Sequence, residues 1–285
     1  MTLDAKKIFG VALVAGGIVL VYWQVFARLI DAWIVDGNYS HGWLIIPIAA
    51  YFVWERRAKL AATPLAPTWF GLVVFAGGIL VLLAGLLGSE LFLSRVSLIL
   101  TLAGIVLFLF GWAHLRIVAF PLAFLLLMIP LPAIVFNRIA FPLQLVASRF
   151  GESIISAASI PVLREGNVLV LANTTLEVAE ACSGIRSLVS LITLGLVFGY
   201  FADPRGWVRA LIVASTIPVA IISNGARVAG TGILAHFYGS AAAEGFFHEF
   251  SGWAVFIVAF LLILAIQRVI LRLAPKAPAT SQAMA

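Results

Sequence analysis

The sequence predicts an all-α polytopic membrane protein with about eight transmembrane helices, a small extracytoplasmic β-hairpin and an interfacial helix. Of its 285 residues, 63% are hydrophobic and 11% are charged, and the mean hydropathy is +1.14. A soluble domain is roughly 45–50% apolar and about 25% charged. A water-soluble fold has too little interior to bury this much apolar surface, so lipid is the expected solvent. The composition therefore excludes a soluble enzyme, a disordered regulator and a disulfide-stapled secreted module.

The apolar residues fall into runs that approach or reach the ~20 residues of a membrane-spanning helix. The expected spans are Ile8–Ile30, Gly42–Trp54, Trp69–Gly88, Val96–Trp112, Leu115–Pro130, Ile185–Phe201, Trp207–Ser223 and Trp253–Leu273. The second run is short, and a re-entrant or interfacial segment is its alternative. We expect one membrane-embedded domain over residues 1–273, followed by a disordered cytoplasmic tail rich in Ala, Pro, Ser and Thr at residues 274–285.

Charge is divided unevenly between the two sides that these spans define. The side with both termini carries 11 Lys and Arg against 3 acidic residues, whereas the opposite side carries 7 Arg against 9 acidic residues. Cytoplasmic loops of membrane proteins are enriched in Lys and Arg, so both termini are expected in the cytoplasm. The same distribution accounts for the net charge of +6. The sequence has no basic stripe with interleaved aromatic residues, so the positive charge does not indicate nucleic-acid binding.

Two long segments are expected on the outer side of the membrane. In the first, Phe141–Ala158 has one apolar face and predicts an interfacial helix. Two short β-type runs follow, Val168–Leu171 and Leu176–Val178, separated by turn residues. They predict a hairpin that leads into the single cysteine, Cys182. The second outward segment is Asn224–Gly252.

Cys182 is the first candidate for chemistry. A helix that begins just after it would direct free N–H groups and its positive dipole end at the sulfur. Arg186 adds positive charge, and both effects favour the thiolate, which is the nucleophilic form. Glu177 and Glu180 act in the opposite direction. The alternative is that Cys182 is a small buried hydrophobe, as free cysteines often are.

Polar residues at the expected outer ends of other spans complete the candidate site. Asn224 and Arg227 are three residues apart, so on a helix they share one face. There they offer an amide and a fixed cation to a carbonyl oxygen that becomes negative during acyl transfer, although an arginine that extends to lipid headgroups is the alternative. His248, His236 and His41 are candidates for a general base or acid, since histidine titrates near neutral pH. A histidine bonded to headgroups or backbone is the alternative for each.

The sequence has no HExxH, no Gly-rich phosphate loop and no cluster with zinc-ligand spacing, so we expect no metal and no cofactor. Cys182, Arg227, His248 and His41 are all assigned to the outer membrane face, although each was selected on local sequence alone. Cysteine, arginine and histidine at one level fit a thiol acyl-transfer site.

At these residues the chain resembles the exosortase/archaeosortase family of membrane cysteine transpeptidases, and it is most similar to the bacterial exosortases. The resemblance covers about residues 30 to 273. The matching motifs are Ala181-Cys182-Ser183-Gly184-Ile185, Asn224-x-x-Arg227, His248 before Ser251-Gly252-Trp253, and Tyr39-Ser40-His41-Gly42-Trp43 followed by Tyr51-Phe-Val-Trp54-Glu-Arg56-Arg57.

The resemblance implies a bacterial inner-membrane enzyme that faces the periplasm and processes secreted proteins with a PEP-CTERM tail. Such a tail is a Pro-Glu-Pro motif, a hydrophobic helix and a basic cluster. Cys182 would form an acyl-thioester and release the helix, and an unknown acceptor nucleophile would take the product. Arg227 would protonate the leaving amine or hold the oxyanion, and His248 would activate the thiol or stabilise the transition state. Archaeal relatives carry arginine in this third role, which favours stabilisation because arginine keeps its proton.

Two other functions compete with this one. A plain protease would use water as the acceptor. A non-enzymatic polysaccharide-export assembly factor or a transporter would not need the cysteine at all. Transporters usually place ionisable residues at mid-membrane depth, whereas the spans expected here are nearly uncharged. Membrane lipids are expected neighbours in every case, and Asn224, Arg186, His41 and Glu180 are expected to support the site.

Overall fold

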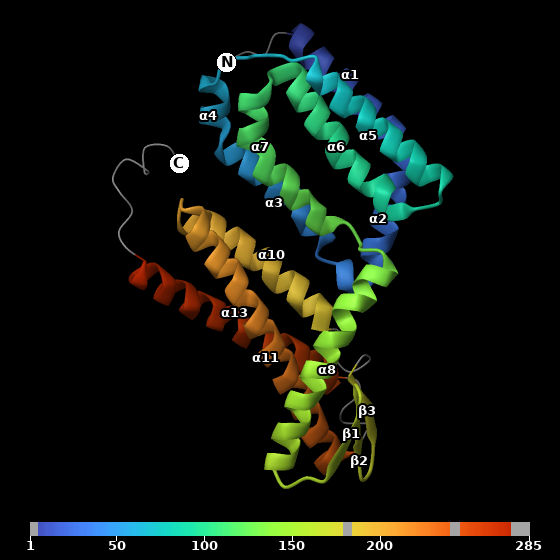
Figure 1. Cartoon of the computed structure of the whole chain (residues 1–285), viewed down its shortest axis with the longest axis vertical. Coiled ribbons are helices and arrows are strands. Elements are labelled where there is room, and N and C mark those ends of the chain that lie inside the picture. Colours follow the sequence, from blue (N-terminus) through green and yellow to red (C-terminus); the bar gives the residue numbers. More distant parts are fainter. Residues whose placement is uncertain (1–4, 179–183, 240–245, 275–285) are drawn as a thin grey trace. The chain divides into compact units, whose positions relative to one another are not determined.

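A computed structural model describes residues 5–178, 184–239 and 246–274 of the chain. It is mostly helical and divides into two compact units, Met1–Pro132 and Ala133–Ala285 (Figure 1). Each unit is described by itself. Cys182, Glu180 and the tail beyond residue 274 lie outside the described residues, as does the side chain of His248.

The first unit consists of α-helices and two short 3₁₀ helices. Its elements are α1 (Ala5–Val21), α2 (Trp23–Val35), η1 (Gly37–Tyr39), α3 (Gly42–Glu55), α4 (Arg57–Ala62), α5 (Phe70–Leu87), α6 (Leu91–Phe110), α7 (Trp112–Phe124) and η2 (Leu125–Met128). Glu90 begins α6 by accepting a hydrogen bond from the main-chain N of Leu93 at 2.9 Å. The buried Trp33 donates from Nε1 to the carbonyl of Met128 at 2.9 Å, which holds η2 against α2.

Glycines bring α5 and α6 together. Gly71, Gly78 and Gly85 recur every seven residues along α5, and each faces main-chain atoms of α6 or of the turn before it. A Cβ at Gly78 would lie 2.8 Å from the main-chain N of Thr101. Small residues allow this close approach of helices within a membrane, where packing rather than the hydrophobic effect holds helices together.

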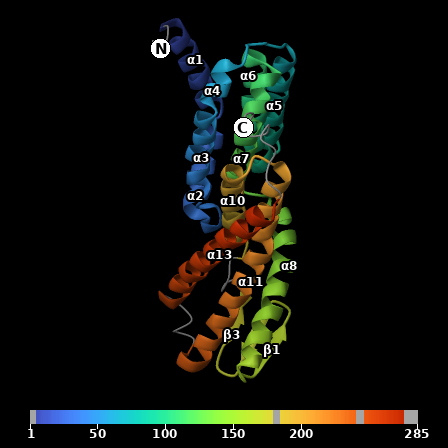
Figure 2. The same cartoon turned by 90° about the vertical axis from the view of Figure 1, so that its left-hand side faces the viewer.

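Within the described residues, the second unit contains four helices and a small sheet that packs on two of them. Its elements are α8 (Ala133–Ala157), β1 (Val162–Glu165), β2 (Val168–Leu171), β3 (Thr175–Glu177), α10 (Gly184–Ala202), α11 (Gly206–Tyr238) and α13 (Phe246–Leu273). The views in Figures 1 and 2 place the sheet beside the ends of α8 and α11. One core cluster joins the inner face of the sheet to these two helices and includes Ile155, Leu169, Val178 and Val228.

The sheet is antiparallel in the order β1-β2-β3. Val168 pairs with Glu177 and Val170 with Thr175, which confirms the predicted hairpin. The strand β1 adds a third member that the sequence analysis did not assign, and Leu163 pairs with Val170. Its burial alternates along the strand, as expected for a sheet with one packed and one solvated face.

The number of spans differs from the prediction. By length and composition, four described helices can cross a membrane, at Phe70–Leu87, Leu91–Phe110, Gly206–Tyr238 and Gly252–Leu273. The count rises to six if each of two bent pairs is one span: Ala12–Val21 with Trp23–Val35, bent by 69°, and Trp112–Met128 with Ala133–Ala157, bent by 82°. A polytopic membrane protein is confirmed. Eight separate spans are not, because α3 has only 14 residues and the apolar part of α10 is short.

Two boundaries also differ. The helix α11 continues to Tyr238, whereas the sequence analysis ended its span at Ser223 and expected an outward segment from Asn224. Alanines and other helix-compatible residues follow Ser223, and Asn224, Val228 and Ala235 are buried, so packing carries the helix onward. The predicted interfacial helix Phe141–Ala158 is the C-terminal part of α8, which begins directly after Pro132.

Candidate active site

Cys182 belongs to the five-residue connection, residues 179–183, between two described elements. On one side β3 ends at Glu177 and is followed by the buried Val178. On the other side α10 is described from Gly184 onward. Arg186 is the third residue of α10, and it is exposed.

Arg227 lies within α11, where its guanidinium packs against a glycine of α13. A Cβ added at Gly252 would lie 3.1 Å from Nη2 and 3.3 Å from Cζ of Arg227. Any larger residue at position 252 would therefore displace the guanidinium. Arg227 is half-buried, so its charge acts in a medium that screens it less than bulk water does.

Three helices meet around this arginine. A small cavity is lined by Leu191 of α10, by Ser223, Asn224 and Arg227 of α11, and by Gly252 of α13. Asn224 is only 6% exposed and also borders a second small cavity, toward α8 and α10. The predicted pairing of Asn224 and Arg227 on one helix face is thus confirmed by their shared cavity.

Helix geometry relates position 248 to this cavity. Because α13 is helical from Phe246, positions 248 and 252 are one turn apart and share a face of the helix. The face of α13 that carries Gly252 meets Arg227. The backbone position of His248 is therefore on the side of α13 that packs on α11.

His236 is separated from Arg227 along α11. The two are nine residues apart, which corresponds to about 13 Å of helix rise. His236 lies in the last turn of α11, and its carbonyl accepts a hydrogen bond from Nδ2 of Asn173 at 3.2 Å. The same amide bonds the carbonyl of Ala235 at 3.0 Å. The structure thus places His236 where the sheet is attached to the end of α11.

His41 belongs to the first unit, between η1 and α3. Its Nε2 lies 3.3 Å from the carbonyl of Leu127, and since a carbonyl only accepts, Nε2 carries the proton. Burial lowers the pKa of His41, which favours the neutral ring. In this position His41 links the start of α3 to η2.

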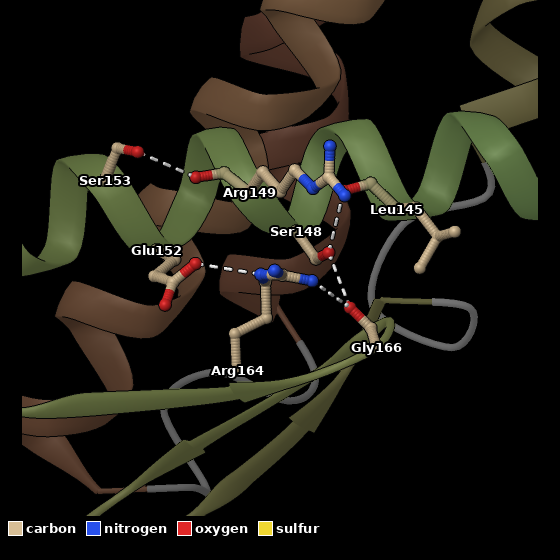
Figure 3. Close-up of polar contacts among 7 residues, drawn as sticks. All are labelled: Leu145, Ser148, Arg149, Glu152, Ser153, Arg164 and Gly166. Carbon is tan, nitrogen blue, oxygen red and sulfur yellow. Dashed lines mark hydrogen bonds and ion pairs between the residues drawn. The ribbon is translucent and has the colours of Figure 1, made fainter.

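A polar cluster that the sequence analysis did not predict attaches the sheet to α8 (Figure 3). Nε of Arg164 pairs with Glu152 at 2.8 Å. The carbonyl of Gly166 accepts from Oγ of Ser148 at 2.9 Å and from Nη1 of Arg164 at 3.1 Å. Gly166 has φ +66°, which suits the tight turn between β1 and β2. The sequence analysis assigned neither this turn nor its partners on α8.

Among the residues that the structure describes, no group of three or more His, Cys, Asp or Glu side chains is arranged to hold a metal ion.

A comparison with protein families gives a match. The family model described as transmembrane exosortase matches residues 33–265. This range extends from α2 into α13 and contains Cys182, Arg227 and His248. Neither a curated protein nor a solved structure matches the chain.

Proposed function

The chain belongs to the transmembrane exosortase family, and from this premise we propose that it is a membrane cysteine transpeptidase of protein sorting. Its substrates are secreted proteins with a PEP-CTERM tail. It cleaves the tail through an acyl-thioester on Cys182 and transfers the product to an acceptor nucleophile. The observation that carries the proposal is the family match over both units, joined to a guanidinium held at the meeting point of three helices.

The reaction has two steps. The Cys182 thiolate attacks the scissile carbonyl, the peptide C–N bond breaks, and the leaving amine takes a proton as the acyl-thioester forms. An acceptor nucleophile then attacks the thioester and restores the thiol. His248 moves the protons or stabilises the charge, because histidine titrates near neutral pH.

Arg227 suits the stabilisation of the oxyanion. Arginine keeps its charge and cannot act as a base at ordinary pH. Its guanidinium is held on Gly252 before substrate arrives, and such preorganised donors are often the largest single contribution to acyl transfer. Asn224 borders the same cavity and supplies a nearby amide. Arg186, Glu180 and His41 have supporting roles.

The test uses the full-length protein in membranes with a secreted reporter that ends in a PEP-CTERM tail. Wild type is expected to shorten the reporter, whereas Cys182→Ala inserts normally and leaves it intact. Shortening by Cys182→Ala would rule out the cysteine mechanism. Mass spectrometry of the product C-terminus separates transfer from hydrolysis, since an added group indicates transfer and a free carboxylate indicates a protease.

The proposal includes location in the bacterial inner membrane, with both termini in the cytoplasm and the site facing the periplasm. The charge asymmetry of the sequence supports this orientation. Cys182 is the only cysteine in the sequence, so thiol labelling shows on which side of the membrane the site lies. A membrane-impermeant maleimide added to intact spheroplasts, whose periplasmic face is open to the medium, is expected to label this cysteine. Labelling that requires lysis would place the site on the cytoplasmic side.

A further inference from the structure

The outer edge of β3 offers main-chain groups next to the segment that holds Cys182. β3 comprises Thr175–Glu177 and is an edge strand of the sheet. Cys182 follows Glu177 by five residues in the sequence. An edge strand presents N–H and C=O groups that can pair with another extended chain.

The hydrogen bonds between β2 and β3 determine which groups point outward. The main-chain N of Leu171 donates to the carbonyl of Thr174, and the N of Val178 donates to the carbonyl of Asn167, both at 2.9 Å. In an antiparallel pair, hydrogen-bonded and non-hydrogen-bonded pairs alternate. The first and third residues of β3 are therefore non-hydrogen-bonded pairs with β2, and their N–H and C=O groups point away from it.

These two residues, Thr175 and Glu177, are exposed. Among the described residues, neither has a main-chain hydrogen-bond partner on the outer side of β3. The residue between them, Leu176, packs on the core cluster, so the strand itself is held in place. Within the part of the chain that the structure describes, the result is a fixed edge with unpaired main-chain groups at two alternate positions.

Side-chain contacts attach the other edge strand, β1, and the turn after it to α8. β1 is tied to α8 by the ion pair between Arg164 and Glu152 and by the bond from Ser148 to Gly166 (Figure 3). Native proteins generally protect their edge strands from pairing with other chains. In the described residues α8 contacts β1, and Thr175 and Glu177 at the β3 edge are exposed.

We propose that the β3 edge binds an extended segment of the substrate polypeptide as a fourth strand. The main-chain groups of Thr175 and Glu177 bond the segment, and this pairing directs its scissile bond toward the connection that carries Cys182. The occupant is an extended peptide because only an extended backbone matches groups spaced two residues apart. The inference rests on the proposed function and adds the mode of substrate binding to it.

Photo-crosslinking tests the position directly. A benzoylphenylalanine replaces Thr175 in the full-length Cys182→Ala protein in membranes, so that capture does not depend on turnover. Leu163 is the matched control, because it is exposed and shares a row of the sheet with Thr175 through Val170. The probe is the tailed reporter. We expect capture from position 175 and background from position 163.

The substrate backbone gives a second readout. N-methylation scanned along a synthetic tail peptide is expected to block capture at alternate positions only, because N–H groups of an extended chain point alternately to the two sides. If wild type shortens the reporter but position 175 captures nothing, or captures no more than position 163, edge binding is wrong and the proposed function stands. If wild type does not shorten the reporter, the proposed function fails and the inference falls with it.

An enzyme variant completes the test. Thr175→Pro removes an outward N–H while it keeps the ladder to β2, as proline permits at an edge. Thr175→Val keeps the N–H and is the control. We expect Thr175→Pro to lower kcat/KM on the order of tenfold, as for one or two main-chain hydrogen bonds, with the rate of maleimide labelling of Cys182 unchanged. Processing by Thr175→Pro at the rate of Thr175→Val would overturn the proposal.

Discussion

Both units use glycine where helices meet, but different atoms lie against the glycines. In the first unit, Gly71 and Gly78 of α5 face main-chain atoms of α6. In the second, Gly225 of α11 faces the ring of Phe150, and Gly252 of α13 faces the guanidinium of Arg227. The α5 glycines Gly71 and Gly78 thus set the distance between two helices, whereas Gly225 and Gly252 make room for a side chain, in one case a functional candidate.

The largest effect is expected at Gly78. Its Cβ in Gly78→Ala would lie 2.5 Å from Oγ1 and 2.8 Å from the main-chain N of Thr101, so α5 and α6 must separate. Overpacking costs about 1–3 kcal/mol, and we expect the upper end because the backbone cannot move aside locally. Gly77→Ala is the control, since nothing lies within 4 Å of its Cβ. If the two variants have equal unfolding free energies in detergent, Gly78 does not set the distance between α5 and α6.

Gly252→Ala tests whether the glycine of α13 makes room for the guanidinium of Arg227. The new methyl group would contact Nη2 of Arg227 at 3.1 Å, and a flexible side chain can yield by a few tenths of an ångström. We expect an unchanged melting temperature but about tenfold slower reporter shortening, or about 1.4 kcal/mol of activation free energy. Gly230→Ala in α11 is the control, with open space at its Cβ. Wild-type activity of Gly252→Ala would show that the position of the guanidinium does not matter.

A buried hydroxyl in the first unit is expected to matter less. Tyr22 Oη lies 2.6 Å from Oγ1 of Thr101 and 3.2 Å from Oγ of Ser97. Hydrogen bonds between membrane helices average about 0.6 kcal/mol, so Tyr22→Phe should lower the unfolding free energy by about that amount and leave shortening unchanged. Tyr238→Phe, at an exposed ring, is the control. Loss of shortening in Tyr22→Phe would link the first unit to the chemistry.

Local features of the second unit were more predictable than its packing. The hairpin follows from short-range patterns of turn residues and β-branched residues. The end of α11 does not, because a search for apolar runs stops at Ser223 although the helix continues on its buried residues. The contact between Gly252 and Arg227 joins residues 25 positions apart. Nothing in the local sequence of either residue indicates it. In the first unit, the bend at Tyr22 divides the run Ile8–Ile30, which the sequence analysis treated as one span.

The smallest effect on stability is expected from the turn between α10 and α11, where charged side chains bond one another. Asp203, between α10 and α11, bonds Arg205 at 2.7 Å, and its carbonyl accepts from Nε of Arg209 at 2.6 Å. The hydrogen bond from Arg205 lowers the pKa of Asp203 below its ordinary 3.8. Folding therefore gains stability from this carboxylate above pH 3.8, and the gain is lost as the pH falls through the lower folded-state pKa. Asp203→Asn should make the melting temperature less dependent on pH than in wild type as the pH falls below 3.8. Identical pH profiles would show that the Asp203 carboxylate does not stabilise this turn.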